Sequence, residues 1–464
     1  MDLSAPGAIL LVSCYELGHQ PLGVAWPMAF LENAGYAPDA LDIAVDPLDV
    51  ARVARARMVA ISVPMHTALR LGVRVAERVR AANPTCHICF YGLYAALNGP
   101  YLLAHGADSV VGGEYEGALV RLVQALAAGD AQDVVGVARA DRPAPPPLLE
   151  RLPFPVPSRA ALPRLDRYAQ LEEAEGHRRA VGYVEASRGC RHTCRHCPIP
   201  PVYGGRFFVV PRDVVLADIR RLVRAGSTHI TFGDPDFLNG PLHSLRIAEA
   251  MHDEFPALTF DVTAKVEHVI ERRALFPRLQ ELGCLFVVSA FESVSDVVLA
   301  ELGKGHTRAD EVVALAVVRD AGMTLRPTWV AFTPWTNLAD YDHMLQFIDN
   351  HGLVDAVDPV QYAVRLLIPP GSALLDRPGI QAFLGGLDEA AFSYRWAHPD
   401  ARVDRLAHAV GGLVEGAAGQ DPAATFDQVR SLAQAAAGRP PAPARSPPPP
   451  NRHRPPRLSE PWFC

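Results

Sequence analysis

Short apolar runs separated by helical patterns fill the first 140 residues of the chain. Apolar runs of about five residues are typical of buried strands, and apolar positions three or four apart are typical of helices that cover a sheet. The predicted strands are Ala8–Ser13, Leu41–Val45, Met58–Val63, His87–Tyr91 and Ser109–Val111. The predicted helices lie over Met28–Ala34, Leu71–Ala82 and Gly117–Ala128. This alternation predicts an α/β domain, a Rossmann or flavodoxin-like parallel sheet, over residues 1–140.

The alternation of strand and helix resumes from about residue 179, after a proline-rich linker over residues 141–178. Proline fixes φ, so the segment Pro143–Pro157 predicts a semi-rigid connection on the surface. The strand-like runs that follow are Gly182–Ser187, His229–Phe232, Thr259–Thr263, Leu285–Ala290, Thr324–Phe332 and Ala356–Val364. They predict a partial (β/α)6 barrel over residues 179–375, with its chemistry at the carboxyl ends of the strands.

The last part of the chain has a different composition. Residues 380–437 are rich in alanine and predict a helical segment, mainly from Leu387 to Ala437. Residues 438–464 include the run Arg439–Arg457, in which prolines alternate with small and basic residues. Such low-complexity sequence cannot bury a core, so it predicts a disordered tail.

Composition and charge narrow the class of protein. The net charge of −7 disfavours a general nucleic-acid binder, so no nucleic-acid partner is expected. Neither a signal peptide nor an unbroken run of about 18 apolar residues is present, which predicts a cytoplasmic protein without a membrane partner. In that reducing compartment the eight cysteines are expected to be thiols or metal ligands. Cys86 and Cys89 lie three apart in or beside a predicted strand, where residues at that spacing point to opposite faces, so we expect packed thiols.

Three cysteines form the strongest motif in the chain. Cys190, Cys194 and Cys197 follow the first predicted barrel strand at spacings of four and three residues. Three thiolates at these spacings can bind an iron–sulfur cluster and leave one iron without a protein ligand. The alternative is a structural zinc site, in which His192 or His196 supplies the fourth ligand.

The CxxxCxxC motif after the first strand of a partial barrel resembles the radical S-adenosylmethionine (radical SAM) superfamily. The resemblance implies a [4Fe–4S] cluster on the three cysteines and S-adenosylmethionine (SAM) chelated to the open iron. An electron, supplied by a donor such as flavodoxin or ferredoxin, then cleaves SAM to a 5′-deoxyadenosyl radical. The residue before the third cysteine is usually aromatic in this family and is His196 here.

Further positions over residues 180–375 carry the same resemblance. Gly233 and Asp234, after the second barrel strand, resemble the segment that receives the amino group of SAM. Lys265 is placed to pair with its carboxylate, and Ser289 with Glu292 resembles the segment that binds the ribose. The ordinary alternatives are an acidic turn for Asp234 and a solvated side chain for Lys265.

The N-terminal domain resembles the cobalamin-binding domain of a radical SAM subgroup. Ser62, Gly92 and Gly113 follow predicted strands, and glycine turns there let the backbone approach a flat ligand or a nucleotide. The Asp-x-His-x-x-Gly pattern that supplies a histidine to cobalt is missing. His19 and His66 lie outside such a context, and we expect both to be polar-core or surface residues.

The chain ends in Glu-Pro-Trp-Phe-Cys, with Cys464 last. This resembles a radical SAM family with a Cys-Cys-Ala-Glu-Pro or Cys-selenocysteine-Ala-Glu-Pro tail (CCAEP or CUAEP). The resemblance implies a possible selenoprotein in which the natural chain continues past Cys464. An ordinary terminus at a cysteine is the alternative.

Together these features predict a radical SAM enzyme that acts on a small molecule or peptide. With cobalamin bound, the expected reaction is methyl transfer to an unactivated carbon. Without it, a radical rearrangement or another hydrogen abstraction is expected. The alternative from another class is a non-catalytic protein that binds zinc or a ligand.

Overall fold

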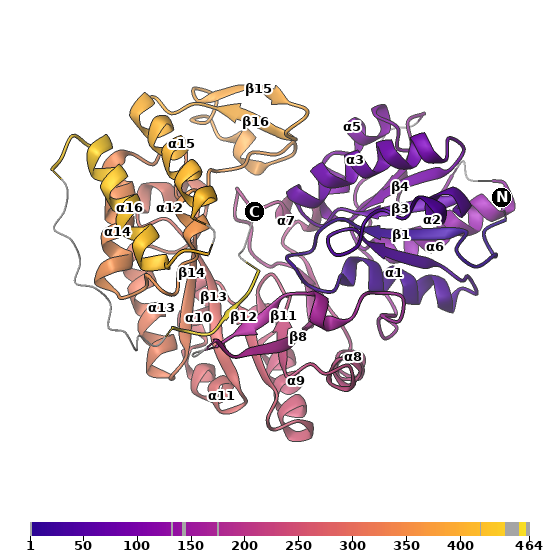
Figure 1. Ribbon diagram of the computed structural model, residues 1–464, viewed down its shortest axis with the longest axis horizontal. Coiled ribbons are helices and arrows are strands. Elements are labelled where there is room, and N and C mark those ends of the chain that lie inside the picture. Colours follow the sequence, from indigo (N-terminus) through magenta and orange to yellow (C-terminus); the bar gives the residue numbers. More distant parts are fainter. Residues whose placement is uncertain are drawn as a thin grey trace.

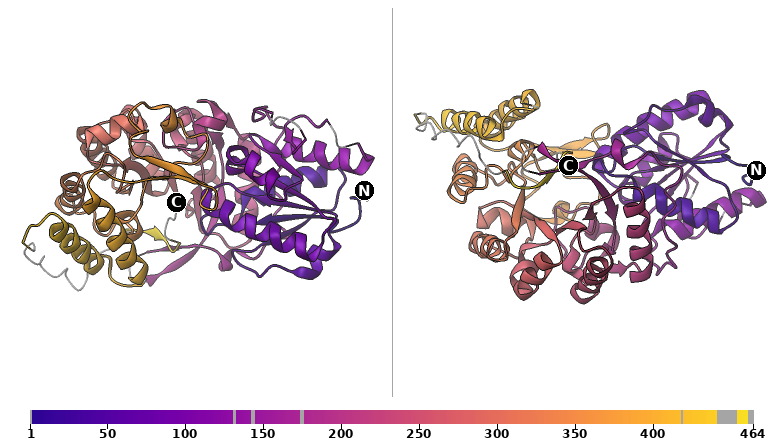
Figure 2. Two further views of the ribbon diagram at one scale, coloured as in Figure 1. Left: turned by 90° about the horizontal axis from the view of Figure 1, so that it is seen from above. Right: turned by 60° about the horizontal axis from the view of Figure 1, so that its bottom comes forward.

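A computed structural model describes residues 2–130, 133–141, 145–173, 176–417, 419–440 and 454–460. Two α/β units lie side by side, the N-terminal one coloured indigo to purple and the second magenta to orange (Figure 1). Two further directions of view show the same arrangement (Figure 2). Among the described helices, none has the length and apolar character needed to cross a membrane.

The N-terminal domain is an open sheet in the order β2-β1-β3-β4-β5-β6, parallel except for the antiparallel edge strand β6. Its strands are β1 (Ile9–Ser13), β2 (Asp39–Asp42), β3 (Met58–Ser62), β4 (His87–Tyr91), β5 (Ser109–Val111) and β6 (Val137–Ala138). Its helices are α1 (Leu22–Asn33), α2 (Val50–Arg55), α3 (His66–Ala82), α4 (Leu93–Leu97), α5 (Gly99–Ala104) and α6 (Tyr115–Ala128). The open α/β sheet predicted from the sequence is therefore confirmed.

The second sheet is curled and has the order β14-β13-β12-β11-β8-β7-β17, in which β7 is Gln170–Glu172 and β17 is Arg457–Leu458. The strands β8 (Arg178–Val184), β11 (His229–Phe232), β12 (Thr259–Thr263), β13 (Cys284–Glu292) and β14 (Thr324–Trp329) run parallel. The short pair β9 (Ser187–Gly189) and β10 (Phe207–Val209) is antiparallel. The helices are α7 (Ile199–Tyr203), α8 (Arg212–Arg224), α9 (Pro241–Glu254), α10 (Val266–Glu271), α11 (Phe276–Glu281), α12 (Asp296–Leu302), α13 (Arg308–Asp320) and α14 (Leu338–Asn350).

The predicted sixth barrel strand, Ala356–Val364, is wrong. Its central residues form the 3-10 helix η5 (Pro359–Tyr362). Proline at the first helical position fixes φ there and has no N–H to donate to a strand ladder. Parallel pairing is reduced to one bridge between Phe332 and Arg365, just beyond η5.

The predicted helical segment begins later than expected, because a hairpin comes first. Its strands are β15 (Leu384–Asp388) and β16 (Ser393–Trp396), and the helices α15 (Ala401–Gly416) and α16 (Pro422–Ala436) follow. Glycine lowers helix propensity, and two glycines lie within β15. Phe392 at the hairpin turn is buried in the core of the N-terminal domain, and His66 Nε2 lies 2.6 Å from the Ala391 carbonyl oxygen.

Residues 454–460 of the tail are ordered, contrary to the disorder predicted there, whereas residues 441–453 of the predicted tail lie outside the described residues. Strand β17 (Arg457–Leu458) pairs antiparallel with β7 (Gln170–Glu172), and Arg457 lies 2.9 Å from Glu172. The N–H of Ser459 donates to the Gln170 carbonyl. Because β7 joins the barrel sheet, that sheet begins before residue 179, inside the predicted linker. Residues 142–144 of the linker and Cys464 lie outside the described residues.

Candidate cluster and cofactor site

The three-cysteine motif forms a loop directly after β9. Gly189 ends that strand with φ +75°, and a Cβ there would lie 2.5 Å from the Arg206 carbonyl oxygen, so the position requires glycine. The N–H of Cys190 donates to the same carbonyl, and the N–H of Arg195 donates to the Leu302 carbonyl. The loop is therefore fixed by β10 on one side and by the end of α12 on the other.

All three motif thiols are free and share one loop. Cys194 is buried, whereas Cys190 and Cys197 are partly exposed. Burial, together with the two neighbouring thiols, raises the pKa of Cys197 to about 12. Such a thiol ionises at neutral pH when a cation is its partner, so the donor set fits a group that supplies positive charge to three soft ligands.

The two histidines of the loop face carboxylates at or just after the carboxyl ends of barrel strands. His196 Nε2 lies 3.2 Å from Glu292 Oε1, and His192 Nε2 lies 3.4 Å from Asp236 Oδ2. These contacts disfavour the zinc alternative, in which one histidine completes a four-ligand site with the cysteines. The arrangement favours three sulfur ligands.

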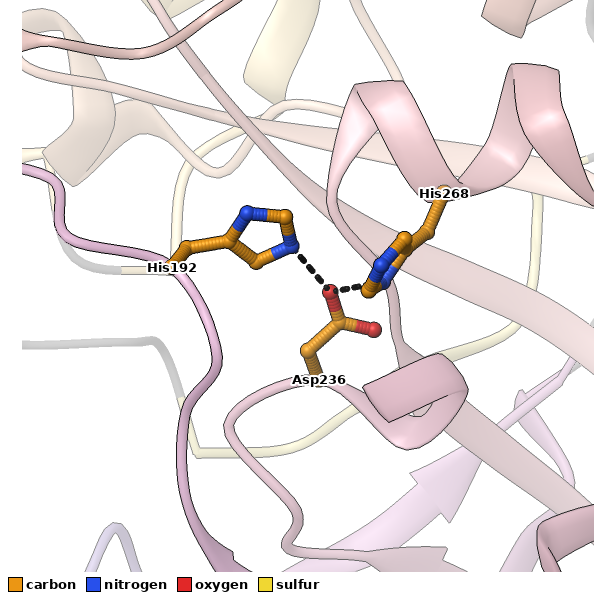
Figure 3. Close-up of side chains that lie close together, drawn as sticks. All are labelled: His192, Asp236 and His268. Atoms are coloured by element: carbon orange, nitrogen blue, oxygen red, sulfur yellow. Dashed lines mark hydrogen bonds and ion pairs between the residues drawn. The ribbon is translucent and has the colours of Figure 1, made fainter. Parts of the chain in front are cut away.

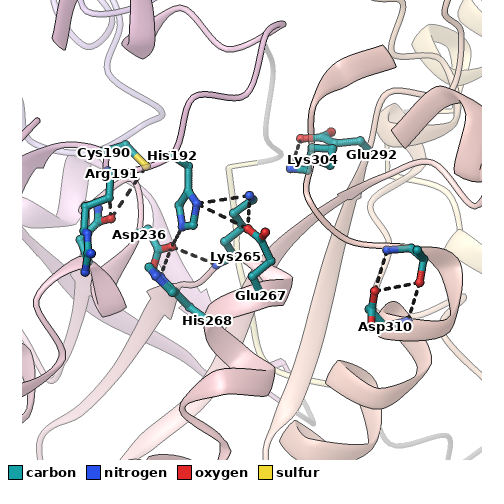
Figure 4. A network of polar contacts seen from close by, with 12 residues as sticks. Cys190, Arg191, His192, Asp236, Lys265, Glu267, His268, Glu292, Lys304 and Asp310 are labelled. Atoms are coloured by element: carbon teal, nitrogen blue, oxygen red, sulfur yellow. Dashed lines mark hydrogen bonds and ion pairs between the residues drawn. The ribbon is translucent and has the colours of Figure 1, made fainter. Parts of the chain in front are cut away.

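His192 belongs to a chain of polar contacts at the ends of β11 and β12 (Figures 3 and 4). His268 Nδ1 lies 2.7 Å from Asp236 Oδ2, which His192 approaches from the other side. Lys265 Nζ pairs with Glu267 and lies 3.3 Å from His192 Nδ1. Although burial opposes ionisation of Asp236, the two histidines lower its pKa. Charge and hydrogen bonds thus connect the loop of the three cysteines, the cysteine loop, to the barrel.

Glu292 and Ser289, predicted for the ribose, lie at the carboxyl end of β13. Glu292 has φ +70° beside an irregularity in the pairing of β13 with β14, and its carboxylate lies 3.3 Å from Lys304 Nζ. Burial opposes ionisation, but Lys304 and His196 lower the pKa of Glu292 to about 2. Ser289 is fully buried, and its hydroxyl has no hydrogen-bond partner among the described residues. Such a hydroxyl is available to a bound ligand.

Gly233 and Asp234 lie where predicted, but their contacts have structural explanations. A Cβ on Gly233 would lie 2.2 Å from the Tyr183 hydroxyl, so close packing requires glycine. The Asp234 carboxylate accepts hydrogen bonds from the Ala186 N–H and the Ser187 hydroxyl. Asp234 therefore connects β11 to the segment between β8 and β9. Two residues later, Asp236 is the carboxylate that faces the cysteine loop.

Sequence reasoning missed Asp236, His268, Asn239 and Lys304. Asn239 Oδ1 accepts a hydrogen bond from the Arg191 N–H and lies 3.9 Å from Cys190 Sγ. Lys304 is buried beside Glu292 although it follows a surface helix, α12. The run Asp-Pro-Asp-Phe-Leu-Asn after β11 was the available signal, but its two aspartates could not be told apart without the fold.

The residues predicted for cobalamin lie at the carboxyl edge of the first sheet. Ser62 ends β3, and Gly92 follows β4 with φ +107°. For Gly113 the structure shows another reason: a Cβ there would lie 2.2 Å from the Leu148 carbonyl oxygen of the linker. Gly113 is therefore required by close packing against the linker, and no ligand contact is needed to explain it.

Each of the four histidines in residues 1–140 has a contact within the protein. His19 stacks on Tyr183, with ring centroids 4.4 Å apart, and burial lowers its pKa to about 4. His66 lies against the hairpin, His87 Nε2 lies 2.8 Å from the Ser109 hydroxyl, and His105 Nδ1 lies 2.8 Å from the Tyr101 carbonyl oxygen. The expectation that His19 and His66 are packed polar residues is confirmed. A cobalamin here fits without a histidine ligand from this domain.

Two family models match the chain. The radical SAM superfamily matches residues 184–347, and the B12 binding domain matches residues 8–123. The chain carries a radical SAM domain behind a B12-binding domain. The matched residues agree with the two sheets. The two families imply a [4Fe–4S] cluster, SAM and cobalamin as cofactors.

Known proteins are similar to this chain. The hopanoid C-3 methylase of Methylococcus capsulatus is 24% identical over 325 residues, which cover 68% of this chain and 62% of that protein. The cobalamin-dependent radical enzyme OxsB, solved with aqua-cobalamin and SAM, has a TM-score of 0.69 at 15% identity, over 86% of this chain and 65% of OxsB. The methyltransferase TsrM from Kitasatospora setae has a TM-score of 0.62 at 16% identity, over 74% and 73%. The chain thus spans somewhat less than two thirds of the methylase and of OxsB.

Proposed function

We propose that this protein is a cobalamin-dependent radical SAM methyltransferase that transfers a methyl group to an unactivated carbon of a small molecule or peptide. One observation carries the proposal: the cysteine loop of the radical SAM domain lies against the carboxyl edge of the B12-binding sheet. Glu114 follows β5 at that edge and accepts a hydrogen bond from Tyr203, which ends the helix after Cys197. The cofactors of the two domains would therefore share one space.

Cofactor roles follow from the side chains at that space. Cys190, Cys194 and Cys197 would hold the cluster, which, when bound, supplies the electron for cleavage of SAM. Lys265, at the start of α10, would pair with a carboxylate of SAM, and the free hydroxyl of Ser289 with Glu292 would bind ribose hydroxyls. Gly233, with its side-chain space filled by Tyr183, offers backbone groups to the amine. Ser62 and Gly92 would border the cobalamin.

The methylase and TsrM support methyl transfer over other radical reactions, because their names state that activity. TsrM has been solved with a tryptophan substrate, which supports a small-molecule substrate here as well. We further propose that a small electron donor such as flavodoxin or ferredoxin reduces the cluster, and that the protein acts in the cytoplasm.

The experiment is anaerobic reconstitution of the full chain with iron, sulfide and hydroxocobalamin, followed by reduction with titanium(III) citrate in the presence of SAM. The protein is expected to bind the iron–sulfur cluster and cobalamin and to form 5′-deoxyadenosine. Extracts of a deletion strain, supplied with methyl-deuterated SAM, then provide the substrate pool. A deuterated product formed together with S-adenosylhomocysteine supports methyl transfer. Formation of 5′-deoxyadenosine and an unlabelled product would contradict it in favour of a non-methylating radical reaction.

A further inference from the structure

A buried group of charges joins the B12-binding domain to the cysteine loop. Arg188 lies in β9, two residues before Cys190, and its Nη1 lies 2.6 Å from Glu116 Oε1 and 3.7 Å from Glu114 Oε2. Its Nε donates to Glu185 Oε2 at 2.9 Å. The side chains of both Glu114 and Glu116 are 0% exposed, and that of Arg188 is 8% exposed. The pairing therefore crosses between the domains in the absence of solvent.

Aromatic rings enclose the guanidinium of Arg188. The ring centroids of Trp26 and Tyr115 lie 5.5 Å from its central carbon, and that of Phe154 lies 4.9 Å away. These rings come from α1, α6 and the linker, all on the side of the N-terminal domain. The cation–π contacts and the exclusion of water strengthen the ion pair and hold the guanidinium in one place.

The other end of the cysteine loop is bound to one of these glutamates, Glu114. Tyr203, the last residue of α7, donates its hydroxyl to Glu114 Oε1 at 2.8 Å. The N–H of Glu114 in turn donates to the Leu148 carbonyl at 2.7 Å, so the linker fixes this turn. Arg188 precedes the loop and Tyr203 follows it. Glu114 and Glu116 therefore contact both flanks of the segment that carries Cys190, Cys194 and Cys197.

Buried charge of this kind is costly. Three carboxylates meet one guanidinium, and burial raises the pKa of Glu114 to about 7 and also raises that of Glu116. Replacing such a group by apolar residues is often neutral or stabilising. The charge group is therefore better explained by its position between the two domains than by a gain in stability.

We propose that Glu114 and Glu116 are positioning residues that set, through Arg188 and Tyr203, the place of the cysteine loop relative to the carboxyl edge of the B12-binding sheet. The inference rests on the proposed function, in which two cofactors react across this boundary. It assigns the Gly-Gly-Glu-Tyr-Glu-Gly turn to contact between the domains, whereas the sequence had suggested contact with the cofactor. Reaction rates depend steeply on such placement.

The test compares two substitutions that each remove one partner of Arg188. Glu116→Gln removes the partner across the boundary, and Glu185→Gln, the matched control, removes the partner within the barrel. Tyr203→Phe is a milder second variant, which deletes only a hydroxyl. Each full-length protein is reconstituted with iron, sulfide and hydroxocobalamin and reduced. The readout is the enhancement of cob(II)alamin spin relaxation by the paramagnetic cluster, which falls steeply with the distance between them.

In Glu116→Gln and Tyr203→Phe the enhancement is expected to fall by about a factor of two or more at wild-type cofactor content, and Glu185→Gln is expected to match the wild type. An unchanged enhancement in Glu116→Gln, or an equal loss in Glu185→Gln, would overturn the inference.

A second readout keeps this test separate from the proposed function. If the wild type takes up no cobalamin, the proposed function fails. Hydrogen–deuterium exchange of the cobalamin-free chain then decides the inference, since the ion group is present without cofactors. Residues 186–206 are expected to exchange several-fold faster in Glu116→Gln than in the wild type or Glu185→Gln. Equal exchange in all three proteins would overturn it.

Discussion

At the scale of single residues, the cysteines and the carboxylates differ in how much the sequence reveals. Cys190, Cys194 and Cys197 are recognisable because ligand spacing within one loop is a local property. Asp234 and Asp236 have the same side chain and lie two residues apart. Asp234 binds Ser187, before the cysteine loop, whereas Asp236 faces His192 and His268. Side-chain direction at the end of a strand separates them, and it depends on the surrounding fold.

Replacement of any motif cysteine by alanine is expected to abolish the cluster and the formation of 5′-deoxyadenosine. The physical reason is that three thiolates are the minimum local ligand set for the cubane. Iron content and the thiolate-to-iron absorbance band measure the result. Cys284→Ala is the control. Cys284 is buried in the barrel core, so this variant is expected to keep the cluster. Full activity in one motif variant would contradict the assignment.

Glu311→Gln is expected to stabilise the protein more at pH 9 than at pH 6. Burial raises the pKa of Glu311 from 4.5 to about 10, and neighbouring His306 is held neutral because burial lowers its pKa to about 4. A carboxyl whose folded pKa is raised contributes its full stability at low pH and loses it as the pH rises toward 10. Glutamine does not titrate, so its advantage over glutamate grows across this range.

Urea unfolding of the full chain under anaerobic conditions, at both pH values, measures that difference. Glu389→Gln, which changes an exposed glutamate, is the matched control. A difference between Glu311→Gln and the wild type that is the same at both pH values would contradict the prediction.

At the scale of elements, buried strands were easier to predict than irregular segments. The structure agrees with the predicted bounds of His87–Tyr91, Ser109–Val111, His229–Phe232 and Thr259–Thr263, because each is a short run rich in β-branched or aromatic residues. The predicted sixth barrel strand is instead a 3-10 helix that begins at Pro359. The hairpin of β15 and β16 was not predicted, because its residues were assigned to the alanine-rich helical segment. Strand β17 has no apolar pattern of its own. Its order depends on Glu172 and the edge of β7, which only the folded chain brings close.

Asp236→Asn is expected to lower the rate of 5′-deoxyadenosine formation about tenfold or more while cluster content is retained. Asp236 joins the cysteine loop to α10 through His192 and His268, and its charge supports both contacts. Product analysis and iron content measure the two quantities. Asp234→Asn is the comparison: it is expected to lower the melting temperature instead, because it loosens the contact with Ser187. Equal effects of the two substitutions on both quantities would contradict the distinction.

At the scale of the whole molecule, the carboxyl edge of the first sheet faces the cysteine loop. Phe392 of the hairpin packs into the N-terminal domain from one side, and the Arg188 group joins the domains at another. Tyr15 near the end of β1 donates its hydroxyl to Glu460 of the tail. Contacts from three distant parts of the chain therefore hold the two domains in one arrangement.

The full chain is expected to bind hydroxocobalamin without a histidine as the lower ligand of cobalt. All four histidines of the N-terminal domain are engaged elsewhere, as His19 is in its stack on Tyr183. After reduction to cob(II)alamin, the paramagnetic resonance spectrum is expected to lack nitrogen splitting from an imidazole of the protein. The spectrum of His19→Ala should be unchanged. Absence of bound cobalamin after desalting, or nitrogen splitting lost in that variant, would contradict the prediction.

The sequence by itself determined the two α/β domains, their order and the three cysteines that we propose as cluster ligands. Each depends on patterns within a few residues, such as apolar periodicity, glycine turns and ligand spacing. Only the tertiary structure decided which aspartate faces the loop, that Gly113 packs on the linker and that Arg188 meets Glu114 and Glu116. Arg188 and these two glutamates lie more than seventy residues apart along the chain. A contact between distant residues leaves no periodic signal in one sequence, because it exists only when separate elements are packed together.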